Sequence, residues 1–417
     1  MDKNNVLSLK KHQAAAFEDP LTELLRAGAR QLLAQAVETE IAAFIEQHEH
    51  LIDAEGRRRI VRNGYLPERS VQTGIGSVEV KVPRVHDRSA EGPRLRFHSN
   101  LLPPYLRKSR SVEAVIPWLY LKGISTGDFS DALAALLGPN AAGLSQPTVS
   151  RLKQVWSEEY AHWQQRDLRA REYVYFWADG IYCNVRHDQE KQCILVIVGA
   201  TKEGRKELVA ISDGYRESAA SWREVLLDLK QRGLARGPSV AVGDGALGFW
   251  KALHEVFGSC KQQRCWVHKT ANVLNSLPKS QQTRAKERLQ EIWMAETKDA
   301  AKQAYANFVE IYAAKYPKAT ACLVKDRDEL MTFYDFPAEH WGHLRTTNPI
   351  ESTFATVRLR TAKVRGCFSR ETVLTMAFRL CQEAEKKWRR LNGSEHVANV
   401  LAGIVYIDGI HPDRIAA

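Results

Sequence analysis

The segment YVYFWADGIYCNVRH, residues 173–187, and the run CILVIVGAT, residues 193–201, decide the fold class of the chain. Both are rich in aromatic and β-branched residues, so they predict strands at 173–179, 181–187 and 193–201. KELVAIS at 206–212 adds a further strand or extends this meander. Helix, strand, helix and strand patterns follow at 218–233, 238–244, 246–257 and 260–266. Meandering strands followed by alternating helices and strands are typical of a mixed α/β sheet.

Helical patterns continue after this sheet. Between about 270 and 340, apolar residues recur at helical spacing without a strand pattern, which predicts an all-helical insertion in the α/β domain. Two more helices are expected at 349–361 and 370–391. We therefore expect one α/β domain at 170–392, followed by a C-terminal tail at 393–417.

The sequence of the N-terminal region predicts three short structural segments before the α/β domain. Residues 1–55 form a helical segment in which an apolar stripe at 20–47 packs internally or dimerises. Residues 56–108 alternate around Gly74 and Gly76, which predicts a β-hairpin, and they hold twelve Lys and Arg against four Asp and Glu. In residues 109–165, helical stretches precede LSQPTVSRL, where Ser145 is the expected N-cap. This order favours a helix-turn-helix DNA-binding unit, with an ordinary helical bundle as the alternative.

Composition narrows the class of partner and compartment. The 417 residues carry a net charge of +11 and a pI near 9.2, which favours an acidic partner such as nucleic acid. Seven scattered cysteines indicate a reducing compartment rather than a disulfide framework. The start lacks the apolar core of a signal peptide, and the longest apolar run, ILVIVGA, is too short to span a bilayer. We expect a cytoplasmic protein without membrane partners.

Three acids are candidates for a metal site. Asp179 and Asp244 each end an expected strand, where α/β sheets bind ligands, although either Asp-Gly pair could instead be a turn. Glu351 heads a basic helix in NPIESTFATVRLR and shares a face with Arg358; it could instead cap that helix. If the three acids converge, their repulsion calls for a cation, and oxygen ligands favour Mg²⁺ or Mn²⁺. Two such ions could orient the attacking and leaving oxygens at a phosphodiester.

Cysteine and histidine offer a second, weaker metal pattern. QRCWVHKTANVL places Cys265 and His268 three residues apart, and Cys260 lies upstream. Three ligands at irregular spacing are one short of a closed zinc site. A buried thiol beside a hydrogen-bonded imidazole is the alternative.

The sequence resembles the Mutator-type transposases of bacterial insertion sequences, a family of the Asp-Asp-Glu recombinase class. The resemblance covers RNGYLPERSVQTGIGSVEVKVPRV, the stretch near SQPTVSRL, and the strand that leads to Asp179. It continues through VGDGALGFWKAL, QRCWVHKTANVL and RTTNPIESTFATVRLRTAKVRGCFS, of which the last two are the most specific. It implies a ribonuclease-H-like catalytic domain, with an all-helical insertion before the final acid.

The resemblance also implies roles for residues. The catalytic and metal-binding triad falls on Asp179, Asp244 and Glu351, with Mg²⁺ as cofactor and Mn²⁺ as a substitute. The Cys265 and His268 pair is expected near the active site or the strand-separation path. A dimer or larger oligomer would bind terminal inverted repeats and target DNA, in a bacterial protein associated with the nucleoid when bound to DNA. Residues expected to contact DNA are Arg57, Arg58, Arg59, Arg62, Arg69, Lys81, Arg84, Thr148, Ser150, Arg151, Lys153, Arg345, Asn348, Arg358, Lys363 and Arg365.

Two rival functions use the same features. A structure-selective nuclease would cut DNA without joining it, and a strand-transfer assay would separate the two. A DNA-binding regulator would keep the fold without activity and would bind ends without cutting them.

Overall fold

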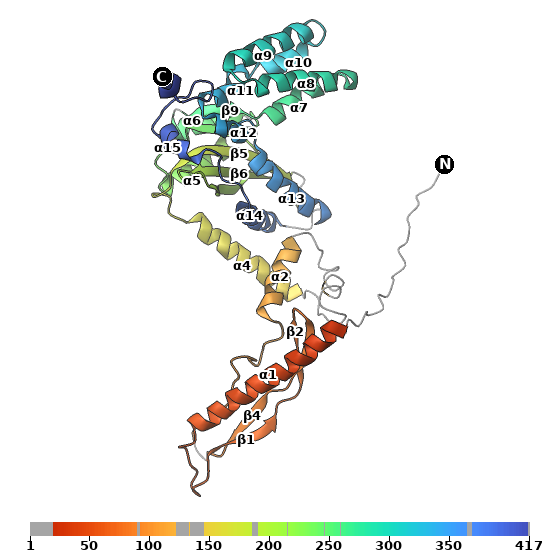
Figure 1. Cartoon of the computed structure of the whole chain (residues 1–417), viewed down its shortest axis with the longest axis vertical. Helices are drawn as coiled ribbons and strands as arrows, with labels where there is room; N and C mark the ends of the chain where they lie inside the picture. The colour runs from red at the N-terminus through yellow and green to blue at the C-terminus, as the bar shows by residue number, and fades with distance from the viewer. Residues whose placement is uncertain are drawn as a thin grey trace, which may run out of the picture. The chain divides into compact units, whose positions relative to one another are not determined.

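The computed structural model divides the chain into two compact units, Met1–Ser150 and Arg151–Ala417, and each is described by itself (Figure 1). The structure describes residues 20–89, 92–121, 133, 146–185, 191–214, 216–245, 247–258, 260–364 and 369–415. Of the predicted helix-turn-helix, helices α2 (Arg110–Leu121) and α4 (Gln146–Gln164) are described. Ser145 and most residues between these helices lie outside that part, so the motif stays a prediction.

The first unit packs a long helix, α1 (Pro20–Gln47), against short strands. The expected hairpin is confirmed: β2 (Arg69–Thr73) pairs antiparallel with β3 (Gly76–Val80). A second antiparallel pair joins β1 (Ile60–Tyr65) to β4 (Pro83–Asp87). Valines at alternate positions of the hairpin face α1, because successive strand residues point to opposite sides. The core holds Val37, Val71, Val78, Val80, Val82 and Leu102.

The apolar stripe of α1 is only partly used inside this unit. Val37 and Ile41 are buried, whereas Leu24 and Leu32 are 69% and 68% exposed. Internal packing is therefore confirmed for the C-terminal half of the helix, and dimerisation through the N-terminal half stays a prediction. No helix in the described ranges has the length and apolar character needed to cross a membrane.

The second unit is built on a five-stranded mixed sheet of order β7-β6-β5-β8-β9. Strands β5, β6 and β7 form an antiparallel meander, and β8 and β9 run parallel to β5. The strands are β5 (Tyr173–Cys183), β6 (Gln192–Thr201), β7 (Lys206–Gly214), β8 (Val240–Gly243) and β9 (Lys261–Arg264). The predicted α/β class and strand order along the chain are confirmed.

One strand boundary was predicted wrongly. Residues 173–179 and 181–187 were expected to form two strands separated at Asp179-Gly180, but β5 runs unbroken through both residues. The neighbouring strand supplies backbone partners across the expected break, since Asp179 pairs with Val196 and Gly180 with Leu195. Asp179 therefore lies inside a strand rather than at its end.

The two faces of the sheet carry different helices. On one face, Phe176 and Ala178 join a buried cluster with α5 (Ala219–Gln231) and α6 (Leu247–Phe257), which also pack on each other. The opposite face of β5 presents Tyr175 and Trp177. The hydroxyl of Tyr175 lies 2.6 Å from His340 Nδ1, and the Trp177 indole donates to the His343 carbonyl at 2.9 Å. By strand alternation, Asp179 shares this second face.

The all-helical insertion is confirmed within the described residues, which form no strand between β9 and the helix that carries Glu351. It contains α7 (Trp266–Asn275), α8 (Lys279–Met294), α9 (Lys298–Ala313), α10 (Pro317–Val324), α11 (Arg327–Leu330), η1 (Thr332–Asp335), η2 (Ala338–His340) and α12 (Trp341–Leu344). Next come α13 (Asn348–Val364), which packs on β5, and α14 (Arg370–Glu385), which packs on β7.

The C-terminal residues extend the same unit. They form η3 (Ser394–His396), α15 (Val397–Leu401) and α16 (Pro412–Ile415). The Tyr406 amide donates to the Asp335 carbonyl at 3.1 Å, and the Lys298 amide donates to Asp408 Oδ1 at 2.6 Å. The tail therefore ties back onto the helical insertion.

A buried ion cluster joins the insertion to the sheet and gives a stability prediction. Asp326 accepts from Arg264 at 3.1 Å and pairs with Lys269 at 2.5 Å, and both cationic side chains are almost fully buried. Asp326→Asn leaves two buried cations without their anion, which should lower the free energy of unfolding by about 3–5 kcal/mol. Urea unfolding measures this. Glu291→Gln, which breaks an exposed pair with Arg288, should change it by less than about 0.5 kcal/mol. Equal effects of the two variants would contradict a structural role for the cluster.

Candidate active site

Two of the predicted acids meet on neighbouring strands in the middle of the sheet. Strand β8 pairs in parallel with β5, with Val242 opposite Trp177. Continuing this register by two residues sets Asp244, just after β8, beside Asp179. Neighbouring strands lie about 4.8 Å apart, so carboxylates at matching positions approach closely. Oxygens of the two side chains lie within 4.8 Å of each other, as the sequence predicted.

A third carboxylate, which the sequence analysis missed, completes this cluster. Glu217 lies between β7 and α5, and one of its oxygens is within 4.8 Å of both Asp179 and Asp244. Gly180 makes room for it, since a Cβ there would lie 2.5 Å from the Glu217 Cδ carbon. The available sequence signal was an acid directly before Ser218, which caps α5 by accepting from the Ser221 amide.

Two of the three carboxylates, Asp179 and Glu217, have raised pKa values. Burial raises the pKa of Asp179 to about 6, and the charge of Asp244 adds to the rise while nearby His268 opposes it. Burial likewise raises the pKa of Glu217 to about 7, with further contributions from Asp244 and Asp179. Such a group of acids, of which Asp179 is buried and the other two are partly buried, is stabilised by a cation, because a positive charge favours the ionised carboxylates.

Glu351 belongs to a neighbouring cluster. It lies in the first turn of α13, and one of its oxygens is within 4.8 Å of both Cys265 and His268. Its Oε1 accepts from the Thr347 hydroxyl at 3.0 Å and lies 3.7 Å from His268 Nδ1. Its charge contributes to the raised pKa of Asp179, so the two clusters are near each other. The convergence of all three predicted acids on one ion stays a prediction.

The Cys265 and His268 pair lies near the acids, as predicted. The pKa of the Cys265 thiol is lowered overall. Burial alone would raise this pKa, but the hydrogen bonds with His268 and Thr347 together have the larger, opposite effect. The contact with Cys265 raises the pKa of His268 to about 9. The imidazole therefore carries a positive charge beside Asp179 and Glu351 at neutral pH.

The alternative zinc site on Cys260, Cys265 and His268 is wrong. Cys260 precedes the four-residue strand β9 and Cys265 follows it. Five residues of extended chain separate their Cα atoms by about 16 Å, which is too far for one ion. Cys260 instead donates to the Lys261 carbonyl at 3.4 Å.

Two arginines predicted to contact DNA have partners within the first unit. Arg59 makes a two-pronged pair with buried Asp87 at 2.7 and 2.9 Å, and this bond holds the pKa of Asp87 well below its usual range. Arg69 donates to carbonyl oxygens of residues 102–106. Both guanidinium groups stabilise the first unit, because they satisfy a buried acid and loop carbonyls.

Arg345, the third predicted DNA contact of this kind, is enclosed by aromatic rings. Its guanidinium carbon lies 4.8 Å from the Phe333 ring centre and 5.3 Å from that of Trp341. Burial lowers its pKa, although it stays protonated. These contacts indicate a packing role beside the helix that carries Glu351.

The other predicted DNA contacts are surface groups or lie outside the described part. Arg57, Arg58, Arg62 and Lys81 form surface ion pairs with Asp53, Glu49, Glu38 and Glu68, respectively. Arg84 donates to the Asn63 carbonyl at 2.7 Å. Ser150, Arg151, Asn348 and Arg358 are exposed, and Lys153 is partly buried. The side chains of Thr148 and Lys363, and all of Arg365, lie outside the described part. DNA contact by these residues stays a prediction.

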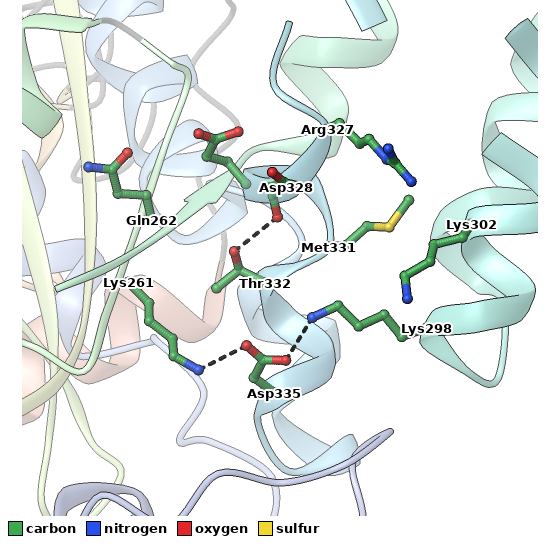
Figure 2. Close-up of a pocket in the computed structure, with 10 residues that line it drawn as sticks. Lys261, Gln262, Lys298, Lys302, Arg327, Asp328, Met331, Thr332 and Asp335 are labelled. Carbon is green, nitrogen blue, oxygen red and sulfur yellow. Dashed lines mark hydrogen bonds and ion pairs between the residues drawn. The ribbon is translucent and has the colours of Figure 1, made fainter. Parts of the chain in front are cut away.

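The cavity in Figure 2 is lined mainly by residues of β9, α9, α11 and η1, and its lining does not include Asp179, Asp244 or Glu217. It has a volume of about 470 Å³. Lys261 and Lys298 both pair with Asp335, at 2.8 and 2.9 Å. Because two lysines neutralise Asp335, its carboxylate is less available to a cation than the carboxylates of Asp179, Asp244 and Glu217.

Comparison with known proteins identifies the protein family to which the chain belongs. Residues 1–391 match the model of the family described as Transposase, Mutator family. The chain is 54% identical to the transposase for insertion sequence element IST2 of Acidithiobacillus ferrooxidans, over 67% of this chain and 95% of that protein. Identity is also 54% to the transposase for IS6120 of Mycolicibacterium smegmatis, over 71% and 91% of the two chains. It is 28% to the transposase for ISRM5 of Rhizobium meliloti, over 88% and 89%. The chain belongs to the Mutator family of transposases.

Proposed function

We propose that this protein is an insertion-sequence transposase that cuts the ends of its element and joins them to target DNA by metal-dependent phosphodiester chemistry. The observation that carries the proposal is the meeting of Asp179, Asp244 and Glu217 beside the central strands β5 and β8, with Glu351 close by. The strand order supports a ribonuclease-H-like catalytic domain. Family membership supports the choice of DNA as substrate.

The donor set fits a hard divalent cation. Three carboxylates within 4.8 Å of one another supply oxygen ligands, which Mg²⁺ and Mn²⁺ prefer. Asp179, Asp244 and Glu217 would hold it, with Glu351 joining from α13. When bound, such ions supply an activated water and neutralise charge that develops on the phosphate.

The chain's own residues would order two successive reactions. In the first, the acids orient a water for in-line attack on phosphorus at the element end; the bond to the 3′ oxygen breaks and that oxygen takes a proton. In the second, the freed 3′-hydroxyl attacks a target phosphodiester, gives up its proton, and displaces the target's own 3′ oxygen. The exposed Arg358 lies on the same helix as Glu351, where it would hold a backbone phosphate.

The same proposal assigns partners. The basic first unit, together with the predicted helix-turn-helix, would bind the terminal inverted repeats. Because two ends must be held together before joining, the active form would be a dimer or larger oligomer. In a bacterial cell, such a protein would associate with the nucleoid when bound to DNA.

A cleavage and joining assay tests the proposal. Wild type and Glu351→Ala are given the element's own ends with Mg²⁺ or with chelator. We expect nicked and joined products from wild type with Mg²⁺ alone, and neither product from the variant. Nicking without joining would favour a plain nuclease. Tight end binding without cleavage would favour a regulator and overturn the proposal.

Acid should weaken metal binding. Protons compete with the cation for the carboxylates of Asp179 and Glu217, whose pKa values are about 6 and about 7. Both pKa values are higher than those of the same groups in an unfolded chain. Without metal, the folded protein therefore binds more protons than the unfolded chain between about pH 4 and 7. The free energy of unfolding consequently falls as pH rises through that window. A bound cation offsets this loss. We expect Mg²⁺ to raise Tm more at pH 8 than at pH 5.5 by calorimetry, and an equal rise at both would contradict the raised pKa values.

A further inference from the structure

Thr347 lies where the helix that carries Glu351 begins, and it is fully buried. Its carbonyl accepts from the amides of Ile350 and Glu351, at 2.9 and 3.1 Å, so its backbone starts α13. Its hydroxyl lies 3.0 Å from Glu351 Oε1 and 3.5 Å from the sulfur of Cys265. The side chain thus bridges the acid and the Cys265 thiol.

The position makes these contacts unusual. A threonine directly before a helix commonly accepts a backbone amide hydrogen bond from the first turn, which stabilises the helix by about 1 kcal/mol. The hydroxyl of Thr347 instead meets two side chains. It carries one proton, and Glu351 Oε1 is both the nearer acceptor and a stronger one than sulfur, so we assign that proton to Glu351. The backbone amide of Thr347 donates to the Cys265 sulfur at 3.4 Å.

Cys265 anchors this contact to the other acids. The Cys265 amide donates to the Gly243 carbonyl at 2.8 Å, and Gly243 directly precedes Asp244. The next residue, Trp266, donates from its amide to the Arg345 carbonyl at 2.9 Å. A continuous path therefore runs from the backbone beside Asp244, through Cys265 and Thr347, to the carboxylate of Glu351.

We infer that Thr347 is a positioning residue that, braced by Cys265, fixes the Glu351 carboxylate relative to Asp179 and Asp244. The inference rests on the proposed function, because it concerns the acids that would hold the cation. Carboxylates that bind metals are themselves oriented by hydrogen bonds, and loss of such a partner typically costs 10–100-fold in affinity. Helix α13 supplies the acid, and Thr347 sets the direction in which its carboxylate points.

The test compares Thr347→Val, which keeps the branched shape but loses the hydroxyl, with Thr347→Ser, which keeps the hydroxyl. Mn²⁺ affinity of the full-length chain is measured by electron paramagnetic resonance. We expect Thr347→Val to bind Mn²⁺ about 10–100-fold more weakly and Thr347→Ser to bind it within about threefold of wild type. Urea unfolding and binding to element ends confirm that both variants fold.

A double-mutant cycle separates positioning from a general structural effect. In a Glu351→Gln background, Thr347→Val should cause no further loss of Mn²⁺ affinity, because the carboxylate on which it acts is gone. An equal loss in both backgrounds, or unchanged affinity of the single variant, would overturn the inference while leaving the proposed function standing. A wild-type chain that binds no Mn²⁺ would overturn both.

Discussion

Replacing Asp179 by asparagine should lower the rate of DNA cleavage by about 10³-fold or more, because a ligand of a catalytic cation is worth several kcal/mol of transition-state stabilisation. The same change should make the metal-free fold no less stable. Asp179 is 7% exposed, and its pKa is raised from 3.8 to about 6. This rise corresponds to a penalty of about 3 kcal/mol for holding the charged form at neutral pH, which the neutral amide avoids.

These opposite effects distinguish a functional acid from a structural one. Cleavage rates with Mg²⁺ and urea unfolding with chelator are measured on the same preparations, and binding to element ends confirms an intact first unit. Asp299→Asn removes an acid on the insertion that pairs with Lys302 on the surface, and it should change neither quantity appreciably. If Asp179→Asn unfolds the metal-free chain or keeps full cleavage, the assignment of Asp179 fails.

Displacing Glu217 should also abolish most metal binding, even when no acid is removed. A Cβ at position 180 would lie 2.5 Å from Glu217 Cδ and Oε1. Since the obstructed atoms are the far end of a flexible side chain, the carboxylate moves and the strand keeps its place. We expect Gly180→Ala and Glu217→Gln each to weaken Mn²⁺ binding by about 10–100-fold, with a matching loss of cleavage at low Mg²⁺.

The matched control is Gly342→Ala, because a Cβ at that position meets nothing within 4 Å. It should leave Mn²⁺ affinity and cleavage at wild-type values. If Glu217→Gln binds Mn²⁺ normally while Gly180→Ala does not, the effect of the added methyl group lies in the strand, and Glu217 is not a ligand.

Local patterns predicted the sheet and the pair Asp179 and Asp244, because strand composition and an Asp that follows a run of strand-forming residues are properties of short segments. The interruption at Gly180 was wrongly predicted, since only the partner strand reveals that the backbone pairs through it. Glu217 was missed for a related reason. Its closeness to Asp179 depends on the path of the chain after β7, and no spacing along the sequence encodes that path.

Charge was the least informative signal. Lys and Arg counts between residues 56 and 108 correctly marked a basic region, but they did not distinguish Arg59, which neutralises buried Asp87, from residues on the surface. The partner of an arginine is set by tertiary packing, so composition alone could not assign it.

The backbone hydrogen bond between the Trp266 amide and the Arg345 carbonyl has an evolutionary consequence. It joins the two ends of the helical insertion, so the gap in the α/β domain that the insertion fills is already closed by the backbone. Closure entropy grows slowly with the length of a loop whose ends are fixed. Selection can therefore lengthen, shorten or exchange the distal helices α8 and α9 as an insertion sequence diverges. The carboxylates of Asp179, Asp244 and Glu351 keep their positions, because this hydrogen bond holds the two ends of the insertion together.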